Sequence, residues 1–384
     1  MRPVIFISLF LAAAVLTGCK SSNPLPKDFY SDSPENRFPP VSVFAKKPSN
    51  ELASLCEQNT CQWDGLQVDN LYRELEKSQM FQAFANERIS AYQIRFTARS
   101  IDYNATVNGA KMVASAATLF VVPTQLKKEY RSEFQVSWNG FELAEYQFAI
   151  PYEETFALYK EPRQADRFAA ESTASKFIAS AQRDGIFTSD FLYAKLQAEN
   201  YPRDLHVPVH VGEYEHVLTY VYPDPFLGAQ LNFKRTGKSA EKTDVFVYPI
   251  RQVEWHDAEK TLEEEIDSAR KEIDLAVKQG AYKTADFGEN QTISFSRDGK
   301  IYTGKVTVGT ITSEPDQNSD SLIYLFMNKD KFVKIRMTRP ATEDKLTRQQ
   351  ADKFIAELLP QLSVPDESYF MANLRRNKRN TGIR

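Results

Sequence analysis

The sequence of 384 residues contains few of the side chains that most often bind metals or carry redox chemistry, with three cysteines and four histidines. Positive and negative charges nearly cancel, because 48 lysines and arginines face 51 aspartates and glutamates. The net charge of -3 gives no indication that the protein binds nucleic acid or an acidic polymer. We therefore expect no nucleic-acid partner.

Local motifs of several enzyme classes are also missing. The chain has no Gly-x-Ser-x-Gly elbow, no Gly-x-x-x-x-Gly-Lys loop, no His-Glu-x-x-His pair and no dinucleotide-type glycine pattern. Ser239 and Lys242 match the Ser-x-x-Lys pattern of penicillin-binding proteins, in which a Lys-Thr-Gly-like strand comes later in the chain. Here Arg235-Thr236-Gly237 precedes Ser239. We predict no catalytic residue and no enzyme activity.

The four histidines do not form a metal-binding pattern. His206 and His210 lie on one face of an extended segment, about 13 Å apart at about 3.3 Å per residue, which is too far to share a zinc ion. A site would need a bend that brings His216 next to one of them. His256 precedes Asp257, which we interpret as a helix cap rather than a catalytic partner. We predict neither a bound metal nor a cofactor.

Residues 1–18 are predicted to be a signal peptide. Arg2 is followed by the apolar run Val4–Leu16, which suits a signal-peptide core and is too short to span a bilayer, which needs about 20 residues. The run ends in Leu16-Thr17-Gly18-Cys19, which resembles the lipobox of bacterial lipoproteins. The resemblance implies cleavage before Cys19, transfer of a diacylglyceryl group to its sulfur and acylation of the freed amine.

The predicted lipid determines where the protein resides. Two or more acyl chains anchor a protein stably, whereas one binds only marginally. In enteric bacteria an aspartate after the lipidated cysteine retains lipoproteins in the inner membrane, and here that residue is Lys20. We therefore expect a lipid anchor on the periplasmic face of the outer membrane, with the inner membrane as the alternative. Residues 19–40 are predicted to comprise this cysteine and a flexible tether.

Cys56 and Cys61 are the cysteines other than Cys19. The periplasm is oxidising, so we predict that they form one local disulfide. A redox-active pair would more typically be spaced as Cys-x-x-Cys. A zinc site would need two further ligands, which nothing nearby supplies.

Residues 41–200 are predicted to form a first α+β domain. Strand patterns begin at Val41 and Tyr92, and alternating residues around Asn139-Gly140 predict a β-hairpin. A helix is predicted from about residue 164 to residue 184. The apolar segment 112–123 could be a buried strand, a short helix or a patch that touches lipid, and its length favours burial.

This order of elements loosely resembles small α+β periplasmic domains of outer-membrane lipoproteins. These include the peptidoglycan-synthase activator lipoproteins and the amino-terminal TolB-like domains. The resemblance also rests on a helix that ends in a short residue followed by phenylalanine, in the phrase Leu71-Tyr72-Arg73-Glu74-Leu75-Glu76-Lys77-Ser78-Gln79-Met80-Phe81. It covers less than half of the chain and offers no functional residue.

Residues 201–365 are predicted to form a second α+β domain. A helix is predicted from Ala258 to Gln279, with one apolar stripe and Gly280 as its stop. The acidic run 263–265 in its first turns is interpreted as a solvated helix start. Both domains are expected to be mainly antiparallel sheets packed with helices.

Residues 366–384 are predicted to be a basic C-terminal tail, which contains Arg375, Arg376, Lys378 and Arg379. The tail is either a solvated terminus or a contact with an anionic surface such as lipid headgroups or peptidoglycan carboxylates.

Three hypotheses about function follow. The first is a non-enzymatic envelope lipoprotein that binds a protein partner in assembly or maintenance. The second is a hydrolase of peptidoglycan or a similar polymer, because glycosidase carboxylates carry no local signature. The third is a carrier that holds a small ligand on an aromatic-lined face.

Overall fold

The structure is a computed structural model that describes residues 37–62, 68–84, 90–158, 164–237, 241–297, 299–313, 317–341 and 348–381. The chain divides into two compact units, Met1–Phe187 and Thr188–Arg384. Each unit contains a mainly antiparallel sheet packed with helices, so the predicted α+β class is confirmed. The predicted signal peptide, Cys19 and most of the predicted tether lie outside the described residues.

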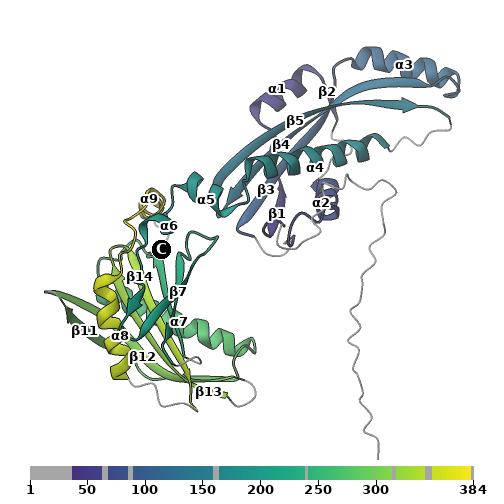
Figure 1. The fold of residues 1–384 in the computed structure, drawn as a ribbon. Helices are drawn as coiled ribbons and strands as arrows, with labels where there is room; N and C mark the ends of the chain where they lie inside the picture. The colour runs from purple at the N-terminus through teal and green to yellow at the C-terminus, as the bar shows by residue number, and fades with distance from the viewer. Residues whose placement is uncertain are drawn as a thin grey trace, which may run out of the picture. The chain divides into compact units, whose positions relative to one another are not determined.

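The described part of the first unit forms a five-stranded sheet (Figure 1). Its strands are β1 (Val41–Ala45), β2 (Thr60–Gln62), β3 (Tyr92–Asp102), β4 (Thr124–Trp138) and β5 (Phe141–Phe156). The order is β1-β3-β4-β5, with β2 paired to β3. Only the β1–β3 pairing among these strands is parallel. Asn139 and Gly140 connect β4 to β5 with φ angles of 46° and 85°, as the Asn-Gly hairpin pattern predicts.

Helices contact both faces of this sheet. Phe177 stacks on Phe134 of β4, with ring centroids 4.4 Å apart. Neighbouring strand residues point to opposite faces, and on the other face the buried Glu133 carboxylate accepts the backbone N–H of Ser49 at 2.9 Å. The helices of this unit are α1 (Asn50–Gln58), α2 (Val68–Lys77), α3 (Ala105–Ala117) and α4 (Gln164–Asp184).

The segment 112–123 is the first place where the structure departs from the sequence-based prediction. Burial was favoured, and it is wrong: the segment comprises the second half of α3 and an exposed loop. The side chains of α3 that are buried are Asn108 and Ser115. Val113 is 72% exposed. Apolar content alone did not fix the orientation, because the polar side chains of this helix have hydrogen-bond partners inside the domain.

The described part of the second unit forms a nine-stranded sheet. Its order is β10-β12-β13-β14-β9-β8-β7-β6, and β11 pairs with β12; the pairings are antiparallel. The strands are β6 (His210–Val211), β7 (Tyr214–Val221), β8 (Ala229–Arg235), β9 (Lys242–Pro249), β10 (Thr284–Phe287), β11 (Gln291–Arg297), β12 (Lys300–Ser313), β13 (Gln317–Asn328) and β14 (Lys331–Pro340).

Two helices pack on opposite faces of this sheet. α8 (Arg348–Gln361) buries its apolar face in the larger core, with residues such as Val333 and Ile335 of β14. α7 (Ala258–Lys278) buries Leu262 and Ile266 in a smaller cluster with Phe332. As predicted, Asp257 caps α7, and its side chain accepts the Lys260 backbone N–H at 3.2 Å. α7 contacts β10, β12 and β13.

The boundary between the units requires a correction. The sequence pattern places it between residues 200 and 201, whereas the chain divides between Phe187 and Thr188. The reason is that the next helices, α5 (Ser189–Leu196) and α6 (Tyr201–Asp204), belong to the second core. The Tyr193 hydroxyl donates to the Tyr222 carbonyl at 2.8 Å, and Tyr201 is buried in the larger cluster.

The predicted C-terminal tail also requires a correction, because α9 (Tyr369–Thr381) is a helix of the second unit. Phe370 and Met371 are buried. Arg375 is 5% exposed, and its guanidinium donates to the Ile250 carbonyl at 3.0 Å and to the Asp330 carboxylate at 3.1 Å. A frayed terminus is therefore excluded for this part of the tail. None of the described helices is both long and apolar enough to span a membrane.

Candidate binding cleft

A cleft of about 920 Å³ lies in the second unit between α7 and the strands β9 and β14. It lies at the margin of the helix, because α7 packs over β10, β12 and β13 and reaches β9 through the hydrogen bond between Glu265 and Tyr248. Loop residues 222–227 and 251–254 contribute to its walls, and Lys378 of α9 contributes at its edge.

Strand alternation places aromatic rings at the floor of the cleft. In β9, Val245 and Val247 face the larger core, so Phe246 and Tyr248 face the cleft. The Tyr248 ring lies 5.5 Å from the ring of Phe332. Lys334 Nζ lies 5.4 Å from the ring centroids of both Phe246 and Tyr248, within the range of cation–π attraction.

Glu265 of α7 contributes a partly buried carboxyl group to the cleft. The Tyr248 hydroxyl donates to its Oε1 at 2.7 Å. Burial raises the pKa of Glu265, although the Tyr248 hydrogen bond and the charge of Lys334 act in the opposite direction. Burial and the nearby Glu265 charge raise the pKa of the Tyr248 phenol well above its ordinary value. Glu265 therefore binds a proton more readily than an exposed glutamate does.

The interpretation of the acidic run as a solvated helix start is wrong for two of its three residues. Glu264 is exposed, as expected. Glu265 points into the cleft. Glu263 accepts hydrogen bonds from Asn290 at 2.7 Å and lies 2.8 Å from Lys305 Nζ, and these contacts lower its pKa. The sequence spacing could not distinguish the three, because the partners of Glu263 and Glu265 come from distant parts of the chain, whereas Glu264 lies 3.9 Å from Lys260 of its own helix.

Charged side chains of both signs surround the aromatic floor. Lys334 Nζ lies 3.8 Å from the carboxylate of Glu272. The Arg251 guanidinium carbon lies 5.5 Å from the ring centroid of Phe226, which also lines the cleft. The acidic lining residues are Glu254, Glu264, Glu265 and Glu272, and the basic ones are Arg251, Lys260, Lys334 and Lys378. Such a lining suits an amphipathic ligand that carries apolar groups and charges.

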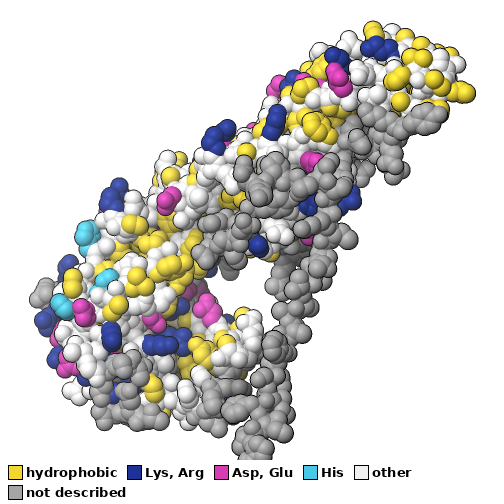
Figure 2. All heavy atoms as spheres, turned by 45° about the vertical axis from the view of Figure 1, so that its right-hand side comes forward, with side chains coloured by type: hydrophobic (Ala, Val, Ile, Leu, Met, Phe, Trp, Pro, Cys, Tyr) yellow, Lys and Arg dark blue, Asp and Glu magenta, His cyan; other side chains and the backbone are white. Residues whose placement is uncertain are grey.

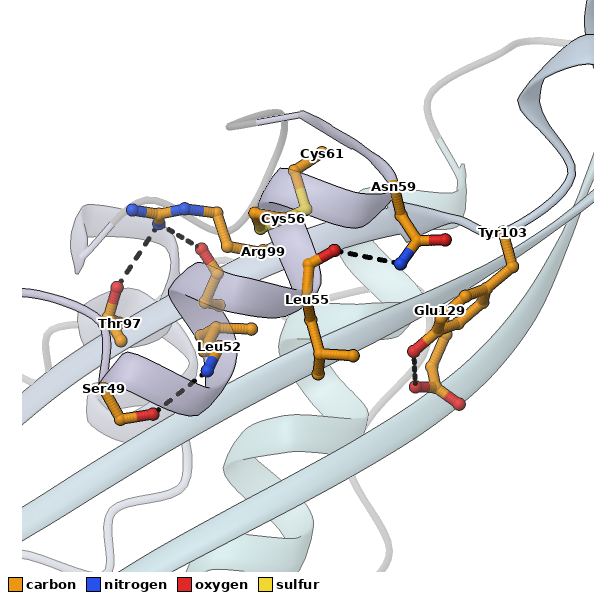
Figure 3. The surroundings of a disulfide bond; sticks show 11 residues. Ser49, Leu52, Leu55, Cys56, Asn59, Cys61, Thr97, Arg99, Tyr103 and Glu129 are labelled. Carbon is orange, nitrogen blue, oxygen red and sulfur yellow. Dashed lines mark hydrogen bonds between the residues drawn. A yellow bond between two sulfur atoms is a disulfide. The ribbon is translucent and has the colours of Figure 1, made fainter.

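The predicted cysteine pair lies in the first unit. The structure places the two sulfurs at disulfide distance and the Cα atoms of Cys56 and Cys61 5.2 Å apart. The bond connects the last turn of α1 to β2 (Figure 3). The other predicted modification site, Cys19, lies outside the described residues.

The four predicted basic contacts do not form one surface. Arg375 is buried in contacts with Ile250 and Asp330. Arg376 is exposed, and Lys378 lines the cleft. The side chain of Arg379 lies outside the described part of the chain. Arg375 is therefore not available to an anionic surface.

The histidines and the Ser-x-x-Lys pattern occupy separate places. His206 and His210 are exposed, whereas His216 lies 3.0 Å from the Thr219 hydroxyl through its Nε2. Within the residues that the structure describes, no group of three or more His, Cys, Asp or Glu side chains could hold a metal ion. Ser239 lies outside those residues, and Lys242 begins β9.

The cleft residues were not predicted from the sequence, although one signal was present. In the second half of β9, from Val245 to Tyr248, the residues on both faces are apolar or aromatic, which is typical of a strand with a covered face on each side. Which helix covers that face, and how much of it, depends on long-range packing. No sequence pattern indicated that Phe246 and Tyr248 would be only half-buried at the margin of α7.

Comparisons with known proteins give weak similarities only. No family model and no curated protein matches the chain. Cyanobacterial PsbP (CyanoP) from Synechocystis sp. PCC 6803 covers 42% of this chain and 92% of its own, with 11% identity and a TM-score of 0.27. The Ran-binding protein Mog1p of Saccharomyces cerevisiae covers 41% and 97%, with 11% identity and a TM-score of 0.20. Scores this low carry no argument about function.

Proposed function

We propose that this protein is a non-enzymatic lipoprotein of the bacterial cell envelope that binds a protein partner in envelope assembly or maintenance. The cleft carries the proposal, because aromatic rings form its floor and charges of both signs surround them. Aromatic and arginine side chains contribute most of the binding energy at protein interfaces. A polypeptide segment of the partner would lie against this lining.

The mixed charges argue against two other classes of ligand. A polyanion would meet acidic groups such as Glu254 and Glu272, and a purely apolar ligand would cover Arg251 and Lys260 without pairing them. A polypeptide segment carries apolar side chains, charges of both signs and backbone amides. It can therefore satisfy the whole lining.

The proposed address rests on the N-terminal sequence. Leu16-Thr17-Gly18-Cys19 resembles a lipobox, and Lys20 favours the periplasmic face of the outer membrane. Replacing Cys19 by alanine should abolish incorporation of labelled fatty acid, and label that still enters the variant would contradict the anchor. The Cys56–Cys61 pair suits an oxidising compartment.

Site-specific photo-crosslinking in the full-length chain tests the partner. A photoreactive amino acid at Phe246, in the cleft, should give an adduct with one envelope protein. The matched control is Ile301, which is 74% exposed in β12 of the same unit and should not give this adduct. Leu227→Asp, which changes an exposed lining residue, should abolish the adduct at position 246.

Two outcomes would contradict the proposal. One is the same set of adducts at positions 246 and 301. The other is no protein adduct at 246 together with a small molecule that remains bound in native mass spectrometry, which would favour the carrier hypothesis.

Hydrolysis of an envelope polymer is a second candidate, favoured by the raised pKa of Glu265 in a cleft. Such a carboxyl group is suited to act as a general acid. The purified protein would be incubated with peptidoglycan, and released fragments would be measured. Release that disappears in Glu265→Gln and persists in the control Glu259→Gln, at an exposed position of the same helix outside the cleft lining, would replace the binding proposal with an enzymatic one.

A further inference from the structure

Helix α3 of the first unit buries two polar side chains, Asn108 and Ser115, and exposes most of its apolar ones. The Asn108 amide group donates to the Asp102 carboxylate at 2.8 Å and to the Lys127 carbonyl at 3.3 Å. The Ser115 hydroxyl donates to the Val122 carbonyl at 2.7 Å. These bonds fix which side of the helix faces the domain. The opposite side therefore exposes aliphatic groups to the surroundings.

The loop that follows α3 extends this apolar surface. Leu119 and Val121 are 75% and 67% exposed. Leu119 and Phe120 have φ angles of 52° and 60°, a region that side chains other than glycine, asparagine and aspartate rarely adopt. Their backbone N–H groups donate to the carbonyls of residues 116 and 115, both at 2.9 Å. Hydrogen bonds thus hold an unfavourable turn that presents an apolar residue outward.

We define the α3 surface as the exposed aliphatic side chains of the helix and its loop, namely Val107, Val113, Leu119, Val121 and Val122. Figure 2 shows hydrophobic side chains gathered at the end of the first unit where α3 lies. Exposed apolar patches of this kind mark contacts with proteins or membranes.

The composition of the α3 surface favours a membrane over a protein. Protein interfaces are enriched in aromatic residues, methionine and arginine and depleted in alanine and lysine. The exposed positions of α3 are alanine, valine, threonine, glycine and Lys111. Between residues 105 and 126, Lys111 is the only ionisable side chain.

Charge at the base of the surface also permits an approach to anionic headgroups. Asp102 is engaged by Asn108. Glu129 binds the side chain of Arg131, and Glu153 lies 3.0 Å from Lys127 Nζ. The two ion pairs are neutral overall, and the Lys111 cation offsets the Asp102 carboxylate, whose Asn108 partner carries no charge. These groups therefore present no net negative charge to anionic headgroups.

We propose that the α3 surface inserts its aliphatic side chains into an anionic lipid bilayer, with Lys111 at the level of the headgroups. The proposed lipid anchor at Cys19 would supply only proximity to the bilayer. The surface itself does not depend on that anchor.

Vesicle co-sedimentation of the chain from Lys20 onward, which lacks the anchor and retains every described residue, tests the proposal. The probe is vesicles of phosphatidylglycerol and phosphatidylethanolamine, with pure phosphatidylcholine vesicles for comparison. The double variant Val113→Asp, Val121→Asp should bind the anionic vesicles at least tenfold more weakly. The matched control Val217→Asp, at a position 62% exposed in the second unit, should bind like the unchanged chain.

The variant Leu119→Asn separates a loss of vesicle binding from a loss of folding. Asparagine tolerates the positive φ of this position, so the variant should keep its melting temperature and still bind about threefold more weakly. Binding by the unchanged chain should persist at high salt, because insertion of apolar groups is not screened.

Three results would overturn the inference. The first is no vesicle binding by the unchanged chain, and the second is equal binding by the unchanged chain, the double variant and Leu119→Asn. The third is a sedimentation-velocity result in which the substitutions change only the self-association of the protein and not its vesicle binding. Because this chain lacks Cys19, none of these results bears on the lipid anchor. Labelling of Cys19 with fatty acid tests that anchor separately.

Discussion

Helices α7 and α3 belong to different units and use their apolar residues in opposite ways. α7 buries Leu262 and Ile266 in a small cluster between the helix and the sheet, and most of its charged side chains face outward. α3 buries Asn108 and Ser115 and exposes Val113. The buried face of α7 is apolar. The buried face of α3 carries polar groups that are hydrogen-bonded to the domain.

The difference follows from what lies beneath each helix. Under α7 lies an apolar strand face that includes Phe332, so apolar burial is favourable. Under α3 lie the Asp102 carboxylate and the carbonyls of Lys127 and Val122. Buried polar groups without partners cost more than exposed valines do. The surroundings of a helix therefore decide which face is buried.

Arg375 of α9 is a third case, in which a charged side chain is buried because the Asp330 carboxylate and the Ile250 carbonyl accept its hydrogen bonds. Replacing it with alanine would leave Asp330 and the Ile250 carbonyl without this partner, so we expect a loss of about 3–5 kcal/mol in the free energy of unfolding. The exposed neighbour Arg376→Ala should change it by no more than about 0.5 kcal/mol. Urea unfolding of both variants provides the measurement; equal small losses would mean that the network does not stabilise α9.

The contrast between α7 and α3 is sharpened by paired truncations. Ile266→Ala creates a cavity in a buried cluster, so we expect a loss of about 3 kcal/mol. Val113→Ala removes an exposed side chain, so we expect a change within about 0.5 kcal/mol. Comparable losses in thermal unfolding of the two variants would show that α3 is buried in solution and would remove the basis of the membrane inference.

These helices also show what the sequence could and could not predict. The 3.6-residue apolar period and Asp257 predicted α7 and its cap, and the Asn139-Gly140 turn predicted its hairpin, because these signals are local. The orientation of α3 depends on carboxylate and carbonyl partners in two strands. The burial of Arg375 depends on Asp330, far away along the chain. Where distant partners determine whether a side chain is buried, the local sequence period does not predict its burial.

The cleft was predicted least well. Phe246 and Tyr248 alternate as strand residues should, but their partial exposure results from where α7 ends its coverage of the sheet. Glu265 stood in an acidic run that appeared solvated, and its Tyr248 partner comes from another element. The lipobox, in contrast, stays a prediction, and it rests on the four consecutive residues Leu16-Thr17-Gly18-Cys19.

Asn108→Leu tests the polar interior of α3 directly. Leucine has a higher helix propensity than asparagine by a few tenths of a kcal/mol. The substitution nevertheless removes hydrogen bonds to Asp102 and Lys127, so we expect a net loss of about 1–2 kcal/mol. An increase in stability, measured by urea unfolding, would mean that these bonds do not fix the orientation of the helix. Asn104→Leu, at the cap position without a side-chain cap hydrogen bond, is the control.

The smallest expected effect concerns Glu263 and Glu265 of α7, whose contributions to the free energy of unfolding should change with pH in opposite directions. Burial raises the pKa of Glu265 above its ordinary value of 4.5, so between these two values the folded protein holds more protons than the unfolded chain. Its contribution to stability is present below pH 4.5 and falls as the pH rises through the folded pKa. Hydrogen bonds from Asn290 and Lys305 lower the pKa of Glu263. That contribution is present above pH 4.5 and is lost as the pH falls through the folded pKa.

Urea unfolding of the unchanged protein, Glu265→Gln and Glu263→Gln between pH 3 and pH 8 would measure the contributions of both carboxyl groups to stability. Glutamine keeps the shape of the side chain and does not titrate, so each difference from the unchanged protein isolates one carboxyl group. With rising pH, the stability of the unchanged protein relative to Glu265→Gln should fall, and relative to Glu263→Gln it should rise. If the difference from Glu265→Gln does not fall with rising pH, Glu265 is solvated like an ordinary glutamate, and neither its place in the cleft nor its suitability as a general acid stands. A difference from Glu263→Gln that does not rise would mean that Asn290 and Lys305 do not bind the Glu263 carboxylate.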